Sequence, residues 1–376
     1  MIKKLTVSNY KAFGSESSEL KILPLTIIVG KNNSGKSSLL KLLSILSTMS
    51  TGRVTSPLLL SNDVVSLGGK YQDLFHNNDT SELQFILENS EGQKLKIKYT
   101  MNQSQLFQVS ENGSGKSLTM NFGKDNPFSS NINNLKSQGE ENNPFQFTTL
   151  YLGPLRPMIE RETRIGGENF EKLVKNGANV DEVLLQSFST DKKIFNEVSF
   201  WLSDNLECTG LNFERNSESS GSYSLSVRHG NAIVNLADVG QGIGQVLPVI
   251  VSSYMDNSPD ITIVEQPVLH LHPAAHQAVA QRLAESAIKM KRNYIIETHS
   301  YNFILALRDM IANSNNPLSE EDVIIYSVEQ DKDESWLKEI TINKKGELSD
   351  WPEGVFAESF EILRSIKSHR DDSTVK

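Results

Sequence analysis

Residues 25–49 read LTIIVGKNNSGKSSLLKLLSILSTM, and this stretch decides the fold. Its first five residues are apolar and rich in β-branched side chains, as in a buried strand. A glycine-containing loop follows, and the apolar residues after Ser37 recur at helical spacing. Strand, loop and helix in this order, with G-x-x-x-x-G-K-[ST] from Gly30 to Ser37, predict a phosphate-binding loop.

The loop residues have distinct expected tasks in binding ATP and Mg²⁺. Glycines let backbone N–H groups turn toward phosphate, and the helix that follows directs its positive dipole end at the same charge. Lys36 is expected to reach the β- and γ-phosphates, and the Ser37 hydroxyl to ligate Mg²⁺. The residues expected to bind nucleotide here are Gly30, Asn32, Asn33, Ser34, Gly35, Lys36, Ser37 and Ser38.

A second GSGKS occurs at 113–117, but the place of the first glycine is taken by Ser110. The residues after it alternate like a strand and provide no helix terminus. We do not expect this segment to bind phosphate.

Length and composition limit the class of protein. The chain has 376 residues, of which 38% are hydrophobic, enough for one large α/β domain with insertions. Its single cysteine, Cys208, excludes an internal disulfide framework and fits a reducing compartment, so we expect a cytoplasmic protein. No apolar run reaches the ~18 residues that span a bilayer, and we expect no membrane partner. With a formal net charge of −9, binding to DNA would require a local basic face.

The pattern along the chain predicts one domain, 1–376, with three additions. Short alternating segments within 78–147 predict an inserted antiparallel β subdomain that contains an Asn-rich loop. Helical spacing predicts a helical lobe at 166–208. Two strand-like runs and the segment WPEGVF make up the C-terminal part, 320–376.

Two further strand ends carry polar residues suited to nucleotide chemistry. The apolar strand in ITIVEQPVLHLHP ends in Glu265, which is expected to hold Mg²⁺ through water. The strand in NYIIETHS leads to His299. Between these strands and the phosphate loop lie the glycine loop GQGIGQ, from Gly240 to Gln245, and Gln72 in GGKYQDLFHN.

Six segments together resemble one family: VGKNNSGKSSLL, YLGPLR, LADVGQGIGQVLP, IVEQPVLHLHP, IIETHS and WPEGVF. They look like the SMC/RecF/OLD-like ABC-type ATPases, in particular a stand-alone bacterial group that ends in a WPEGF-type module. That group is similar to the ATPase components of anti-phage defence systems. The resemblance implies an α/β fold, the ABC-type ATPase head, with a mixed sheet around a central P-loop core. It also implies a homodimer or higher oligomer in which ATP is sandwiched between heads.

The resemblance assigns roles to the distal motifs. The glycine loop would be the signature that meets the partner's nucleotide, through Gly240, Gly242, Gly244 and Gln245. Related sequences commonly have a serine in the place of Gly244, so one hydroxyl donor is missing. His299 would contact the γ-phosphate, and Gln72 would contact Mg²⁺ and the attacking water.

The chain departs from an active ATPase at Gln266, which stands where a catalytic glutamate usually follows the acidic strand end. An amide can position water but cannot accept its proton at neutral pH. Losing a general base costs about 10² to 10⁴ in rate, so we expect slow hydrolysis. Glu297 either supplies the missing carboxylate or orients His299, and both alternatives remain open. The expected catalytic set is Lys36, Glu265, Gln266 and His299, and the expected Mg²⁺ set is Ser37, Gln72 and Glu265.

Two functions remain from the sequence. The first is an ATP-controlled dimeric switch in an anti-phage defence complex, with the effector or nuclease on another chain, because fewer than ~80 residues follow His299. The alternative is a RecF/SMC-like DNA-repair ATPase that binds DNA as an ATP-closed dimer. A transporter ATPase subunit is disfavoured by the large inserted lobes and by the ETHS and WPEGVF segments.

Overall fold

The computed structural model describes residues 1–54, 56–78, 82–102, 105–112, 117–118, 143–164, 172–216, 221–257 and 259–350. The WPEGVF segment and all but the end of the Asn-rich loop lie outside these residues. None of the helices within these ranges has the length and hydropathy needed to cross a membrane.

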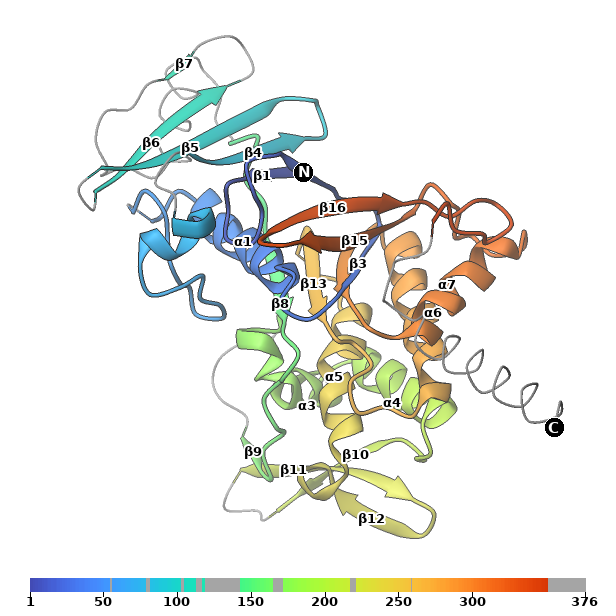
Figure 1. The fold of residues 1–376 in the computed structure, drawn as a ribbon. Coiled ribbons are helices and arrows are strands. Elements are labelled where there is room, and N and C mark those ends of the chain that lie inside the picture. The colour runs from blue at the N-terminus through green and yellow to red at the C-terminus, as the bar shows by residue number, and fades with distance from the viewer. Residues whose placement is uncertain are drawn as a thin grey trace, which may run out of the picture.

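A six-stranded mixed sheet forms the centre of the molecule, in the order β16-β15-β3-β14-β13-β8 (Figure 1). Five strands are parallel, and β16 is antiparallel at one edge. Their bounds are β3 (Leu25–Gly30), β8 (Thr149–Leu152), β13 (Ile261–Glu265), β14 (Asn293–Glu297), β15 (Val323–Asp331) and β16 (Glu334–Ile340). The predicted α/β class with a mixed sheet is therefore confirmed.

The central sheet is covered on both faces because its strands are apolar on both sides. In β3, Leu25, Ile27 and Val29 belong to one buried cluster, whereas Ile28 belongs to another. The Ile28 cluster includes α1 (Lys36–Ser50) and the second sheet. The opposite cluster includes α5 (Gln241–Tyr254), α6 (Pro273–Lys289) and α7 (Tyr301–Ala312) (Figure 1).

The second sheet is antiparallel, in the order β2-β1-β4-β5-β6-β7, and lies beyond α1 (Figure 1). Its bounds are β1 (Ile2–Ser8), β2 (Ser18–Lys21), β4 (Leu83–Asn89), β5 (Lys94–Asn102), β6 (Gln105–Asn112) and β7 (Ser117–Leu118). The strands expected within 78–147 are therefore hydrogen-bonded to the N-terminal strand β1 and extend its sheet. Alternation in sequence identifies a buried face but not the neighbouring strand, so this pairing was not foreseen.

A helical layer and a small sheet complete the described fold. Helices α3 (Val180–Ser189) and α4 (Lys193–Asn205) pack with α5 in the apolar cluster on that face. The small sheet follows at the far end of the molecule (Figure 1). It consists of β9 (Thr163–Arg164), β10 (Leu211–Arg215), β11 (Ser222–His229) and β12 (Ala232–Asn235). The short 3-10 helices are η1 (Tyr71–Leu74), η2 (His76–Asn78), η3 (Lys175–Gly177) and η4 (Leu236–Asp238).

Candidate nucleotide-binding site

The parallel sheet brings three sequence motifs to one edge. The carboxyl ends of neighbouring parallel strands meet at the same side of a sheet, which is where α/β proteins bind ligands. Strand β14 lies between β3 and β13, and the register places Glu297 beside both Ile28 and Glu265. The phosphate loop, the acidic strand end and the ETHS segment therefore converge although 228 residues separate Ser37 from Glu265.

The phosphate loop requires glycine at both ends for physical reasons. Gly30 has a φ of +146° and Gly35 a φ of +99°, which L-residues rarely adopt. A Cβ on Gly30 would lie 2.7 Å from the carbonyl oxygen of Val328 in β15. A Cβ on Gly35 would lie 3.1 Å from both Ala12 and Phe13. The loop thus turns tightly between its neighbours and leads directly into the N-terminus of α1, the arrangement that phosphate binding needs.

Lys36, the first residue of α1, is folded back into the loop. Its Nζ donates to the carbonyl oxygens of Gly30 at 2.9 Å and Lys31 at 2.7 Å. It also lies 3.8 Å from Glu297 Oε1. Burial lowers the pKa of Lys36, and the nearby carboxylates of Glu297 and Glu265 oppose that shift. The ammonium group is therefore placed between the loop and the strand ends, as a phosphate-binding lysine should be.

Ser37 and Glu265 form the oxygen-rich part of the site. The Ser37 hydroxyl donates to Glu265 Oε2 at 2.5 Å, and the Tyr151 hydroxyl donates to Glu265 Oε1. Burial and the adjacent Glu265 raise the pKa of Tyr151, so the phenol keeps the proton that it donates. A hydroxyl beside a carboxylate provides the hard oxygen ligands that Mg²⁺ prefers. The two predicted ligands Ser37 and Glu265 therefore fit a magnesium ion.

Gln266 and Glu297 are coupled by two hydrogen bonds. The Gln266 backbone N–H donates to the Glu297 carbonyl oxygen at 2.8 Å, and Gln266 Nε2 donates to Glu297 Oε2 at 2.8 Å. Gln266 has a left-handed φ of +49°, a conformation that occurs at functional sites. The amide that replaces the usual glutamate is therefore oriented by the carboxylate of the next strand.

Glu297 is the centre of a polar group that also contains His299. Burial raises the pKa of Glu297 to about 7, although Lys36 favours the charged form. His299 Nε2 lies 3.4 Å from Glu297 Oε1, while the imidazole stays 41% exposed. This contact supports the orientation of His299 by Glu297, and the exposed ring can reach a ligand at the strand ends.

The glycine loop begins α5. Gly240 is the N-cap, and a Cβ on Gly242 would lie 2.9 Å from the His270 carbonyl oxygen. Within the described part of the chain, and apart from sequence neighbours and the helix's own backbone, nothing lies within 4 Å of a Cβ built on Gly240 or Gly244, so the loop faces open space there. We expected Gln245 to meet nucleotide, but its side chain is buried and engaged by Arg156.

The remaining predicted residues occupy different surroundings. Asn32 and Asn33 are exposed in the loop, and Asn33 has a left-handed φ of +63°. Ser34 is buried, and its hydroxyl has no hydrogen-bond partner among the described residues. The Ser38 carbonyl oxygen accepts from the Tyr10 hydroxyl at 3.1 Å. Gln72 is exposed in η1, outside the hydrogen-bonded group that joins Ser37, Glu265, Gln266 and Glu297.

Sequence reasoning missed Tyr151 and Arg156 as site residues. Both belong to YLGPLR, a segment that stands out in the sequence only through its resemblance to a family. The sequence offered one signal for these residues, an arginine and two prolines directly after an apolar strand. Such a pattern is ordinarily interpreted as a solvated loop. Only the tertiary structure shows that Arg156 turns inward and is 3% exposed.

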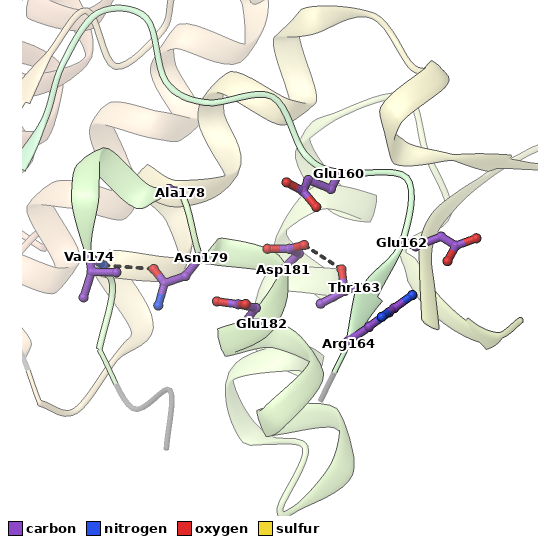
Figure 2. A pocket seen from close by; sticks show the side chains of 9 residues that line it. All are labelled: Glu160, Glu162, Thr163, Arg164, Val174, Ala178, Asn179, Asp181 and Glu182. Carbon is purple, nitrogen blue, oxygen red and sulfur yellow. Dashed lines mark hydrogen bonds between the residues drawn. The ribbon is translucent and has the colours of Figure 1, made fainter. Parts of the chain in front are cut away.

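A separate acidic hollow of about 570 Å³ lies between β9 and the start of α3 (Figure 2). Its lining includes Glu160, Glu162, Asp181 and Glu182. Figure 2 shows Asp181 directed at Thr163, whose hydroxyl donates to Asp181 Oδ2 at 2.5 Å. Among the residues that the structure describes, no three His, Cys, Asp or Glu side chains are arranged to hold a metal ion. We assign no ligand to this hollow.

A family model described as "AAA domain, putative AbiEii toxin, Type IV TA system" matches residues 25–306. The chain belongs to this family. The match runs from β3 through the ETHS segment into α7, so it contains the whole hydrogen-bonded site. A second model, "Protein of unknown function (DUF3696)", matches residues 318–365. No curated protein matches the sequence.

Solved structures of SMC heads share the fold. One is an SMC head bound to the C-terminal winged-helix domain of ScpA, with a TM-score of 0.54 and 12% identity. The alignment covers 91% of this chain and 98% of that one. Another is an SMC head with an extended coiled coil bound to the C-terminal domain of ScpA from Pyrococcus furiosus. Its TM-score is 0.51 at 12% identity, with 97% and 99% of the two chains covered. The protein is therefore an ATP-binding AAA-family protein with the ABC-type, SMC-like head fold.

Proposed function

We propose that the protein binds Mg²⁺–ATP at the phosphate loop and acts as a slowly hydrolysing, nucleotide-controlled dimeric switch. The observation that carries the proposal is the contact between Ser37 and Glu265, with Lys36 beside them. Lys36 would bind the phosphates, and Ser37 and Glu265 would hold Mg²⁺. A bound Mg²⁺ supplies charge neutralisation at the γ-phosphate. Gln72 would be a further contact of the Mg²⁺ ion. This assignment rests mainly on the position of Gln72 in the sequence.

Slow turnover follows from the chemistry of Gln266. Its side-chain amide is committed to donating a hydrogen bond to Glu297, so its carbonyl oxygen is left to accept a hydrogen bond from water. A proton from that water would have to reach a carboxylate, and we assign this role to Glu297, which accepts a hydrogen bond from the Gln266 amide. ATP would then persist in the closed dimer until hydrolysis or a partner releases it.

The dimer is proposed from the placement of the glycine loop. Gly240 and Gly244 face open space at the start of α5, where backbone N–H groups and the helix dipole can meet an anion from another molecule. In the proposed head-to-tail arrangement, Gly240, Gly242 and Gly244 would contact ATP held by the partner subunit. Gln245 would then support this loop from behind and not touch the nucleotide.

We infer a role in bacterial anti-phage defence, with the effector or nuclease on a separate chain. The support is the description of the matching family, which names a putative toxin of a toxin–antitoxin system, together with the resemblance of the motifs. The likeness to SMC heads crystallised with a domain of ScpA supports a head that docks a second protein. We also propose the domain divisions predicted from the sequence and a cytoplasmic location for the protein.

Isothermal titration calorimetry with Mg²⁺–ATP tests the nucleotide site. We expect one ATP per chain for the wild-type protein and none for Lys36→Ala, because the ammonium group is the principal cation beside the loop. Lys31→Ala is the matched control, since Lys31 contributes only its carbonyl oxygen to the Lys36 contact. Equal binding by wild type and Lys36→Ala would refute the site.

The alternative function is a DNA-repair ATPase that binds DNA as an ATP-closed dimer. The observation that favours it is the overall likeness to SMC heads. It predicts a non-specific DNA mobility shift that requires ATP and weakens as salt rises. Absence of any shift at low salt with Mg²⁺–ATP present would exclude this alternative in favour of the switch.

A further inference from the structure

Arg156 is a buried cation that connects two segments of the site. Its Nη1 donates to the Gln245 carbonyl oxygen at 2.9 Å in the first turns of α5. Its Nη2 donates to the Glu265 carbonyl oxygen at 2.6 Å and approaches that of Gln266 at 3.4 Å. Within the described ranges, these guanidinium partners are all main-chain carbonyls, so Arg156 binds backbone segments and not one particular side chain.

The connection to α5 is strengthened by a reciprocal pair of hydrogen bonds. The Arg156 backbone N–H donates to Gln245 Oε1 at 2.9 Å, and Gln245 Nε2 donates to the Arg156 carbonyl oxygen at 2.8 Å. Arg156 and Gln245 are 3% and 5% exposed, so water cannot readily replace these bonds. The glycine loop is therefore attached to the segment after β8 through its last residue.

The connection to β13 acts at the turn that presents the catalytic side chains. Nη2 of Arg156 contacts the carbonyl oxygens of two successive residues, Glu265 and Gln266. Gln266 adopts its left-handed φ at this point and directs its amide to Glu297. A shift of the guanidinium group would therefore move the backbone that carries both Glu265 and Gln266.

We propose that Arg156 is a positioning residue that couples the two ATP sites of the dimer through one subunit. This inference rests on the proposed head-to-tail function. In that arrangement the glycine loop of a subunit meets the partner's ATP, whereas Glu265 and Gln266 serve the subunit's own ATP. Arg156 holds both segments at once, so nucleotide contact at the glycine loop is transmitted to the hydrolytic turn of the same chain.

Lysine cannot reproduce this connection, although it preserves the charge. A guanidinium group presents donors in a rigid planar fork, which suits two separate backbone segments. An ammonium group is a single point charge on a flexible stem and reaches one segment well. Arg156→Lys therefore tests the connection while it keeps a buried cation at the same place.

Arg292 offers a matched control at the opposite end of α5. It is 6% exposed, and its Nη1 donates to the Ser252 carbonyl oxygen at 2.7 Å. Arg292→Lys therefore removes a comparable buried guanidinium contact with the same helix, away from the nucleotide loops. The readouts are the Kd for Mg²⁺–ATP, kcat at saturating ATP, the Hill coefficient of hydrolysis and the thermal midpoint of each variant.

We expect Arg156→Lys to keep the Kd for ATP within about threefold, lower kcat about tenfold and bring the Hill coefficient to about 1. Arg292→Lys should keep the wild-type Hill coefficient at a similar loss of thermal stability. Arg156→Lys with wild-type kcat and Hill coefficient, or equal kinetic losses in both variants, would overturn the coupling alone. A wild-type protein without ATP binding or an ATP-dependent dimer would overturn the proposed function with it.

Discussion

The Glu265 carboxylate accepts one hydrogen bond on each oxygen, from Ser37 and from the Tyr151 hydroxyl. The hydrogen bond from Tyr151 fixes the orientation of this carboxylate, so its oxygens would be held in place for a metal ion. At the proposed magnesium site, Tyr151 would therefore orient Glu265 in the way that outer ligands of a metal site orient inner ones.

We expect Tyr151→Phe to weaken Mg²⁺-dependent ATP binding several-fold and to lower stability by about 1–3 kcal/mol, because a buried acceptor loses its donor. Tyr294→Phe is the control, since the Tyr294 hydroxyl is also buried and bonds Ser286 Oγ at 2.8 Å. Calorimetric titrations at several Mg²⁺ concentrations measure the effect. Identical Mg²⁺ dependence in both variants would contradict a role for Tyr151 at the metal site.

A second residue-level prediction concerns the hydrolytic carboxylate. If Glu297 takes the proton of the attacking water in place of Gln266, Glu297→Gln should lower kcat by ~10² or more with little change in ATP affinity. An amide at 297 would still orient His299 through a hydrogen bond. Single-turnover rates with excess protein measure the chemical step, and an unchanged rate would restrict Glu297 to the orientation of His299.

The raised pKa of Glu297 also predicts a pH dependence of stability. A carboxyl group with a pKa of about 7 in the fold and an ordinary value of 4.5 when unfolded binds more protons in the native state. Its stabilising contribution is complete below pH ~4.5 and disappears as the pH rises through about 7. The free energy of unfolding should therefore fall more steeply between pH 5 and 8 in wild type than in Glu297→Gln. Parallel pH profiles from urea titrations would disprove this assignment.

At the scale of elements, the phosphate loop depends on its close approach to neighbouring segments. Gly30 packs against β15 of the central sheet, and Gly35 packs against the turn that follows β1 of the second sheet. The glycine spacing is therefore required by packing as well as by the phosphate.

We expect Gly35→Ala to abolish measurable ATP binding, because the new methyl group would meet Ala12 and Phe13 in a backbone conformation that already disfavours it. Gly92→Ala is the matched control. Gly92 also has a positive φ, +77°, but none of the residues that the structure describes comes within 4 Å of its added Cβ, sequence neighbours apart. Both variants should lose about 1 kcal/mol or more of stability. ATP binding by Gly35→Ala at the level of Gly92→Ala would show that the loop tolerates a side chain.

At the scale of the whole molecule, the two clusters of nucleotide residues lie at different places on one head. The Ser37–Glu265 contact lies at the carboxyl ends of the central strands, whereas the glycine loop begins α5 beneath them (Figure 1). In the proposed head-to-tail order, each chain would supply one part of each site, and two chains would complete two sites.

Light scattering after size exclusion should then report a mass near twice 41.9 kDa with Mg²⁺–ATP and the monomer mass with ADP. Lys36→Ala should remain monomeric in both conditions, because the bound triphosphate joins the two heads. The dimer should persist for many minutes, given the slow hydrolysis expected from Gln266. A mass that does not respond to nucleotide would contradict the dimeric switch.

The sequence alone determined the phosphate loop, the acidic strand end and the α/β class, because each depends on local spacing. The strand, the glycine turn and the helix all lie within 25 residues. The spacing of the apolar residues and the positions of the glycines suffice to predict them. The pairing of the 78–147 strands with β1, the burial of Gln245 and the inward turn of Arg156 depended on the tertiary structure. Those features are contacts between segments far apart in the chain, and only packing selects which partner a strand or a buried cation receives.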